Sequence, residues 1–325
     1  MFRYKDLIMP NVLKIMLFFA ISINTYSLEG MIKDYKERIL PTYNDCKSEN
    51  YCLLTGDVES SELVVILPGN KEPYLMYLGM ALDIQKKAKK NVVLVEQRGQ
   101  GLNSRPLKNK QKIHVQNFDQ YINDIDKLLV KLKKKIRFSK IKFIGHSMGS
   151  LIAFEYAKIN PSLVSELVLS SPMFKIKAFG LPETLVRNVT SFLSSTPLKE
   201  SYAFGEGDYK ERSFHMTNRS TSSRKWYDFS TFIHKEHPEL TTGGNTFGWV
   251  SGAYVKAHTR HSGVDKLRMK VVMFQATDDE VVDPNEIKKM CELLSDCTLV
   301  TLTKAKHDLF REKEIHRKKL FEYIF

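Results

Sequence analysis

Residues 141–149 decide the fold: Ile141-Lys142-Phe143-Ile144-Gly145-His146-Ser147-Met148-Gly149. The first four residues are typical of a short buried strand, and the pentad that follows matches the pattern Gly-x-Ser-x-Gly. A helical stretch from about Met148 to Ile159 comes next and stops at Asn160-Pro161. A serine at the tip of a tight strand-to-helix turn exposes its hydroxyl, and the flanking glycines let the backbone pack closely. We therefore predict that Ser147 is a nucleophile rather than part of an ordinary glycine-flanked turn.

The same alternation of strand and helix runs along most of the chain. Apolar, β-branched runs predict strands at 63–67, 91–96, 141–144, 167–170, 270–275 and 298–302, whereas 74–89 and 117–134 have helical periodicity. Strands that are apolar on both faces and spaced by helices predict an α/β fold, with a mostly parallel sheet covered on both faces. Residues 31–60 are expected to form a polar entry segment.

The alternation stops between about residues 174 and 268, in a stretch that is aromatic and polar. Because it begins after one core strand and ends before the next, we predict a cap inserted into a single domain of residues 28–325. The aromatic side chains of the cap, Trp249 among them, are candidates to line an acyl channel rather than only the cap's own core.

The N-terminus predicts an export signal. Arg3, Lys5 and Lys14 precede an apolar run from Ile15 to Ile23, which is too short to span a bilayer, and cleavage is expected after residue 27. An uncleaved anchor is the alternative. We expect the protein to be periplasmic, membrane-peripheral or secreted. In an exported protein, the close pairs of cysteines at 46 and 52 and at 291 and 297 predict two local disulfides, with buried thiols as the alternative.

The formal net charge is +13, which is compatible with an anionic membrane surface, with nucleic acid or with a lysine-rich composition alone. The basic residues are scattered over predicted helix faces and do not form a stripe interleaved with aromatic residues. We therefore predict peripheral contact with an anionic membrane and no nucleic-acid partner. We predict neither a metal nor another cofactor.

A serine hydroxyl needs a base, and the base needs an acid that orients it. His307 follows the last predicted strand and is expected to be the base. Asp278, Asp279 and Asp283 all follow the preceding strand, and each carboxylate is able to orient an imidazole. The amide of Met148 is expected to form half of an oxyanion hole, and the loop Pro68-Gly69-Asn70-Lys71-Glu72 provides the second donor, Asn70.

Several motifs together resemble bacterial lysophospholipases of the monoacylglycerol-lipase-like α/β-hydrolases. They are Leu67-Pro68-Gly69-Asn70-Lys71-Glu72, Glu96-Gln97-Arg98-Gly99-Gln100-Gly101, the serine pentad, Gln275-Ala276-Thr277-Asp278-Asp279-Glu280-Val281-Val282-Asp283 and, in the cap, Tyr202-Ala203-Phe204-Gly205-Glu206-Gly207 with Gly243-Gly244. The resemblance implies an α/β-hydrolase fold and a triad of Ser147, Asp279 and His307. The sequence departs from the wider pattern at Pro68-Gly69, where His-Gly is usual, and at Glu96-Gln97 and Ser150.

The resemblance also implies a serine esterase that cleaves single-chain lipid esters through an acyl-enzyme, with a lysophospholipid as the expected substrate. Arg219 and Arg224 in the cap are the candidates for binding a phosphate headgroup, because a guanidinium offers paired donors. A monoacylglycerol lipase or carboxylesterase, a peptidase similar to proline iminopeptidases, and a binding protein built on an inactive hydrolase are the alternatives. Glu206 has no obvious second carboxylate with which to hold a substrate amine.

Overall fold

The computed structural model describes residues 27–56, 60–178 and 180–325. The predicted export signal, residues 1–27, lies outside the described residues except for Ser27, which caps the first helix, α2. Within the described residues, no helix combines the length and apolar character that crossing a bilayer requires.

A seven-stranded sheet forms the centre of the molecule, in the order β1-β3-β2-β4-β5-β6-β7. The strands are β1 (Tyr51–Leu54), β2 (Glu62–Leu67), β3 (Asn91–Val95), β4 (Lys140–His146), β5 (Val164–Ser170), β6 (Lys270–Ala276) and β7 (Cys297–Leu302). Every pair is parallel except that of β1 with β3. The predicted α/β fold and its six strands are therefore confirmed.

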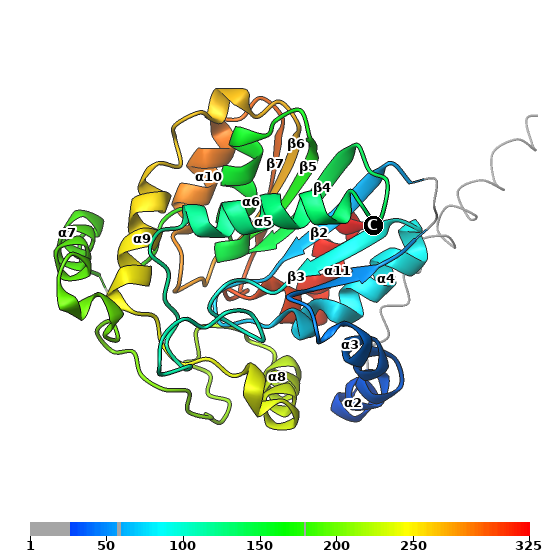
Figure 1. Ribbon diagram of the computed structural model, residues 1–325, viewed down its shortest axis with the longest axis horizontal. Coiled ribbons are helices and arrows are strands. Elements are labelled where there is room, and N and C mark those ends of the chain that lie inside the picture. The colour runs from blue at the N-terminus through cyan, green and yellow to red at the C-terminus, as the bar shows by residue number, and fades with distance from the viewer. Residues whose placement is uncertain (1–26, 57–59, 179) are drawn as a thin grey trace, which may run out of the picture.

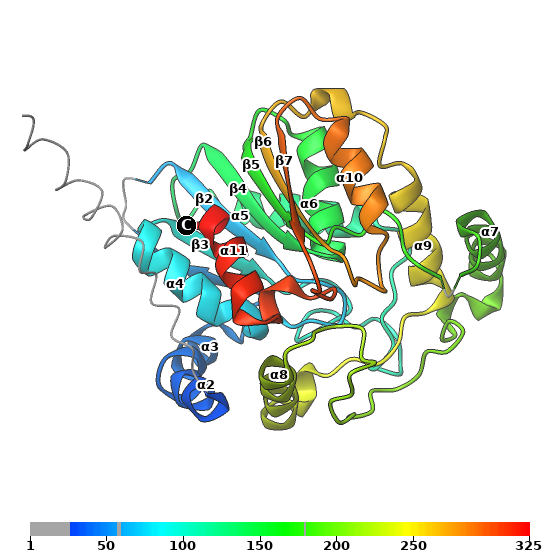
Figure 2. The same ribbon diagram turned by 180° about the vertical axis from the view of Figure 1, so that it is seen from behind.

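Helices cover both faces of the sheet (Figure 1). Helices α5 (Asp119–Leu132), α6 (Met148–Ile159) and α10 (Pro284–Glu292) pack on one face. On the opposite face, seen from behind in Figure 2, lie α4 (Leu78–Ala88), which follows a 3₁₀ turn at Tyr74–Tyr77, and α11 (Glu314–Ile324). The inner strands β2, β3 and β4 are buried on both faces because both layers of helices cover them, whereas the edge strand β7 is partly exposed.

The N-terminal segment is the main departure from the predicted fold. Residues 31–60 were predicted only as a polar entry segment, with no helix or strand assigned. They contain the end of α2 (Leu28–Asp34), a π-helical stretch (Tyr35–Ile39), α3 (Leu40–Cys46) and the edge strand β1. Tyr35, Ile39 and Tyr43 are spaced four residues apart and are all buried. That spacing forms one helical face, which packs on the second core cluster together with residues of α4.

The described residues between β5 and β6 form helices and no further strand of the sheet. It contains α7 (Glu183–Ser194), α8 (Arg224–Glu236) and α9 (Phe247–His258), with short 3₁₀ turns at Pro197–Glu200, Pro238–Leu240 and Val264–Lys266. These helices lie along one end of the sheet (Figure 1). The ring of Trp249 on α9 packs edge-on against Phe118, with centroids 5.3 Å apart, and so fixes α9 to the start of α5.

Two disulfides join neighbouring elements, as the sequence predicts. Cys46 at the end of α3 is bonded to Cys52 in β1, and Cys291 in α10 is bonded to Cys297 at the start of β7. Each bond links a helix to the strand that follows it.

Candidate active site

Ser147 lies at the junction of β4 and α6 in a strained backbone conformation, with φ of 49° and ψ of −112°. A non-glycine residue in this region is held there by its surroundings. The Ser147 amide donates to the carbonyl oxygen of Ser170 at 2.9 Å, which fixes the turn to the end of β5. A Cβ atom at Gly145 would lie 2.7 Å from Cα of Ser150, and one at Gly149 would lie 2.2 Å from the carbonyl oxygen of Leu67. The turn therefore requires both glycines.

The structure brings Ser147, His307 and Asp279 into one hydrogen-bonded chain. Nε2 of His307 lies 2.9 Å from Oγ of Ser147, and Nδ1 of His307 lies 2.7 Å from Oδ2 of Asp279. The other Asp279 oxygen accepts the amides of Val281 and Val282 at 2.8 and 2.9 Å. All three side chains are buried. The geometry allows His307 to accept the serine proton while Asp279 holds the ring.

The two other aspartates that the sequence left open lie elsewhere. Asp278 is exposed and accepts a hydrogen bond from the Thr277 hydroxyl at 2.8 Å. Asp283 caps α10 through the Asn285 amide and forms an ion pair with Lys175 at 2.8 Å. Of the three, only Asp279 contacts the imidazole in this structure.

The electrostatics of the pair suit a base that gains a proton. Burial lowers the pKa of His307, but the charge and hydrogen bond of Asp279 outweigh it, so that this pKa is raised above its usual value. Burial raises the pKa of Asp279, yet the His307 charge and the two backbone amides outweigh it and lower this pKa. Asp279 therefore remains ionised and favours the charged imidazolium.

The two expected oxyanion donors lie next to Ser147 and in the loop after β2. Met148 is the first residue of α6, where amides have no partner within the helix. In the other loop, the side-chain amide of Asn70 donates to Oδ1 of Asn245 at 3.0 Å, while the Asn70 Oδ1 atom is buried without a partner among the described residues. Asn70 thus connects this loop to the segment between β5 and β6.

Two glutamines, which the sequence analysis did not assign to the site, support this loop from the turn after β3. Gln97 donates its side-chain amide to the carbonyl oxygen of Pro68 at 2.6 Å, and Gln100 donates to that of Gly69 at 2.9 Å. The side-chain oxygen of Gln100 accepts the Lys71 amide at 2.9 Å, where Lys71 has a positive φ of 68°. Their position in the Glu96–Gly101 motif was the available signal, but a motif does not reveal which loop its side chains contact.

A cavity of about 680 Å³ opens over Ser147 and His307. Its apolar lining comes mainly from the segment between β5 and β6, and it includes Met173, Ile176, Leu181, Val186, Phe204, Phe247, Trp249, Val250 and Tyr254. Cations also line it: Lys71, Lys177, Lys210, Arg212 and Arg219.

The three cap residues selected from the sequence have different positions. Trp249 lines the cavity, is buried and donates its indole N–H to the Tyr121 hydroxyl at 3.0 Å. Arg219 also lines the cavity and donates to the carbonyl oxygen of Glu280. Arg224 is not among the lining residues, because it begins α8 and pairs with Asp228 at 2.6 Å.

Among the described residues, Glu72, His146 and Asp308 form the only acidic and histidine cluster with ligand atoms close enough to share a metal, within 4.8 Å of one another. Both carboxylates already contact the guanidinium of Arg311. The positive charge at this cluster is therefore an arginine of the chain itself.

The fold and the serine turn define an α/β-hydrolase. The chain belongs to the Hydrolase_4 family (serine aminopeptidase, S33), whose model matches residues 59–314. It is 25% identical over 264 residues to the probable lysophospholipase L2 of Haemophilus influenzae, covering 81% of this chain and 82% of the relative. It is 27% identical over 232 residues to lysophospholipase L2 of Escherichia coli K12, covering 71% of this chain and 67% of the relative.

Solved structures share the fold at lower sequence identity. The monoacylglycerol lipase of Paleococcus ferrophilus matches with a TM-score of 0.66 and 19% identity, covering 84% of this chain and 97% of the other. A soluble variant of the Saccharomyces cerevisiae monoglyceride lipase matches with a TM-score of 0.64 and 18% identity, covering 84% and 88%. The comparisons confirm the family resemblance and the predicted enzyme class, a hydrolase of carboxylic esters.

Proposed function

We propose that this protein is a lysophospholipase that cleaves the ester of a single-chain phospholipid with Ser147 as nucleophile. The hydrogen-bonded chain from Ser147 through His307 to Asp279 carries the proposal. His307 takes the serine proton as Oγ attacks the carbonyl carbon, and it returns a proton to the departing glycerol oxygen. Water, activated by the same imidazole, then attacks the acyl-enzyme and releases the fatty acid.

The tetrahedral intermediate carries its negative charge on the former carbonyl oxygen. In our proposal, the backbone amides of Met148 and Asn70 donate to that oxygen. The position of Met148 at the start of α6 supports its role, because the partial positive charge of the helix N-terminus also favours an anion.

The cavity supports a lipid substrate with an anionic headgroup. Its apolar side chains suit one acyl chain, and its volume lies within the range of roughly 300–1,000 Å³ typical of small-molecule sites. Lys177, Lys210, Arg212 and Arg219 put positive charge on the same cavity, where a phosphate would find charge-assisted donors. The names of the lysophospholipase L2 relatives point to the same substrate class. In this proposal, residues 174–268 act as the cap that selects the substrate.

The family description leaves an aminopeptidase as the competing function. Such an enzyme needs an uncompensated acid to hold the substrate's amine. Glu206 lines the cavity, but its carboxylate pairs with Lys71 at 2.8 Å. Asp208 also lines the cavity, and its Oδ1 atom accepts hydrogen bonds from the Tyr202 hydroxyl and the Asn109 side-chain amide. These contacts of the two acids favour the lipid over the amine.

Export and membrane contact belong to the proposal as well. The pattern of residues 1–27 and the two disulfides support an oxidising compartment outside the cytoplasm. The net charge of +13 supports peripheral binding to anionic lipid.

A substrate panel tests the function. Purified protein is given lysophosphatidylethanolamine, monoacylglycerol, a two-chain phospholipid and an aminoacyl amide at matched concentration, with Ser147→Ala as the blank. We expect the lysophospholipid to be cleaved fastest. Preference for monoacylglycerol would keep the mechanism and change the substrate, whereas faster cleavage of the two-chain lipid or the amide would reject the proposal.

A further inference from the structure

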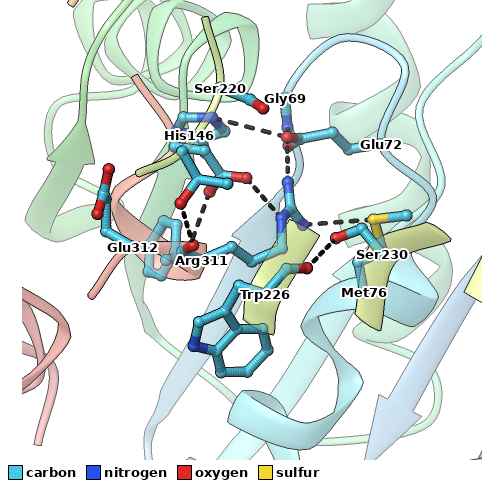
Figure 3. Close-up of polar contacts among 12 residues, drawn as sticks. Gly69, Glu72, Met76, His146, Ser220, Trp226, Ser230, Arg311 and Glu312 are labelled. Atoms are coloured by element: carbon cyan, nitrogen blue, oxygen red, sulfur yellow. Dashed lines mark hydrogen bonds and ion pairs between the residues drawn. The ribbon is translucent and has the colours of Figure 1, made fainter. Parts of the chain in front are cut away.

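Arg311 lies where the loops that carry the candidate catalytic groups meet. It ends the 3₁₀ turn Leu309–Arg311, and its side chain is only 7% exposed. Nε donates to Oδ2 of Asp308 at 2.5 Å, and Nη2 donates to Oε1 of Glu72 (Figure 3). Both carboxylates are largely buried, with 6% and 15% of their side chains exposed. One guanidinium thus bridges two acids from distant parts of the sequence.

Glu72 links Arg311 to the loop after β2, residues 68–72, which we call the oxyanion loop. Its Oε2 atom accepts the Gly69 amide at 2.8 Å and the Tyr77 hydroxyl at 2.5 Å. Gly69 also lies against His146, since a Cβ atom at Gly69 would be 2.8 Å from Cδ2 of that ring. The position of Gly69, and hence of the neighbouring Asn70 amide, therefore depends on the Glu72 carboxylate.

Asp308 links Arg311 to His307, because both residues lie in the loop after β7, which we call the base loop. It directly follows His307, and its amide donates to the carbonyl oxygen of Ser220 at 2.8 Å. His146, which directly precedes Ser147, places its ring centroid 4.9 Å from that of His307. A displacement of Arg311 would therefore reach the base on one side and the oxyanion loop on the other.

Arg311 itself is not part of the catalytic cavity. Glu72, His146, Ser147 and His307 line that cavity, but Arg311 does not. Two further contacts of its side chain also lie outside that cavity: Nη1 donates to Sδ of Met76 at 3.4 Å, and the guanidinium lies 5.3 Å from the Tyr77 ring centroid.

We propose that Arg311 is a positioning residue. It holds the oxyanion loop through Glu72 and the base loop through Asp308, so that the Asn70 amide and His307 keep their positions relative to Ser147. The inference rests on the proposed function, because it assumes that these two loops act in ester hydrolysis. The hydrogen bond between Ser147 Oγ and His307 Nε2 is 2.9 Å long, so a small displacement of either loop would misalign the reacting groups. The chemical step would then slow although no reacting group is removed.

The charged groups around His307 predict a second measurable effect of substituting Arg311, a shift in the pKa of His307. The groups that face His307 are Asp279, Glu72, Asp308 and His146. Arg311 lies behind Glu72 and Asp308, with which its guanidinium forms hydrogen bonds. Burial lowers the pKa of His307, while Asp279, Glu72 and Asp308 raise it. Removing the Arg311 charge leaves the acids uncompensated and should raise this pKa further. Removing the Glu72 charge should lower it.

The test compares Arg311→Gln with Arg260→Gln. Arg260 is a matched control because its side chain is also largely buried, at 9% exposure, and pairs with Glu286 on α10 at 2.6 Å, away from the two loops. Each variant is assayed on p-nitrophenyl butyrate, with the active sites counted by a fluorophosphonate. We expect Arg311→Gln to lower kcat about 10–100-fold per site with KM nearly unchanged. Arg260→Gln should retain kcat within about twofold even if its Tm falls.

The pH profile gives an independent result. The acidic limb of kcat/KM should move to higher pH in Arg311→Gln and to lower pH in Glu72→Gln. Equal kcat per titrated site in Arg311→Gln and wild type, or equal losses in the two arginine variants, would overturn the proposal. If Arg311→Gln does not fold, Glu72→Gln decides, and an unchanged kcat with an unmoved limb in that variant is the overturning result.

The failure of the proposed function would look different. It would appear as wild-type protein that hydrolyses no ester, in which case the rate of fluorophosphonate labelling replaces kcat. A lower labelling rate in Arg311→Gln but not in Arg260→Gln would still support the positioning role. Equal labelling rates would overturn it.

Discussion

The contact between Asp279 and His307 predicts how the substitution Asp279→Asn would change each hydrogen bond of the imidazole. The Oδ1 atom of Asp279 accepts two backbone amides, and Oδ2 faces Nδ1 of His307 at 2.7 Å. In Asp279→Asn, the amide oxygen should remain with the two backbone donors. The NH₂ group would then face Nδ1 and force it to accept a hydrogen bond. The ring proton would move to Nε2, which could no longer accept the Ser147 proton.

The expected loss follows from this change of tautomer. Substitution of the triad aspartate by asparagine in a serine protease lowers kcat about 10⁴-fold, a magnitude taken from that system. The same geometry predicts a loss of about 10³–10⁴-fold here. The side chain keeps its size and its backbone hydrogen bonds, so the fold should survive.

Asp283→Asn is the matched control. It lies four residues away, caps α10 and forms an ion pair with Lys175, whose side chain is 37% exposed. Asparagine caps a helix as well as aspartate does, and a partly exposed ion pair contributes only about 0–1 kcal/mol. We expect kcat within about twofold of wild type and a slightly lower Tm.

The assay measures kcat for a soluble chromogenic ester across pH 5–9, together with Tm for each variant. A folded Asp279→Asn variant with near-normal kcat would refute the reasoning. Loss of activity in Asp283→Asn but not in Asp279→Asn would also refute it.

Three further predictions concern packing, disulfides and pH. Gly149→Ala should destabilise the fold by about 1–3 kcal/mol, measured by denaturant titration, because its Cβ atom would lie 2.2 Å from the Leu67 carbonyl oxygen; unchanged stability would contradict the tight turn. Replacing Cys291 and Cys297 together by serine should lower the free energy of unfolding by about 2 kcal/mol for so short a loop, and no change would show that the bond does not constrain the unfolded chain. Since His307 must be neutral to act as a base and its pKa is raised, kcat/KM should fall as pH drops through a value above the ordinary histidine pKa of about 6.5, and a midpoint below it would contradict the assigned pair.

Much of the sheet was predictable because its strands are short apolar, β-branched runs, and because β2, β3 and β4 end at turns that contain glycine. The serine turn was predictable for the same reason, since Gly145 and Gly149 directly bracket Ser147. The N-terminal helices were missed because the apolar positions Tyr35, Ile39 and Tyr43 are surrounded by charged and polar residues. The spacing of four residues between these positions is the signal of the helical face.

The acid could not be selected from local sequence, because Asp278, Asp279 and Asp283 all follow β6. Only the path of the loop brings Asp279 to His307. The contacts of Gln97, Gln100 and Arg311 with the catalytic loops were also beyond sequence reasoning. Each joins segments far apart in the chain, the longest separation being 239 residues between Glu72 and Arg311.

Covalent labelling by a fluorophosphonate tests the central claim most directly. The probe requires a serine activated by a neighbouring base, and peptide mapping identifies the serine that it modifies. The structure predicts a single adduct on Ser147, lost in Ser147→Ala together with ester hydrolysis. An adduct on a different residue, or a Ser147→Ala protein that still hydrolyses ester at the wild-type rate, would contradict the account.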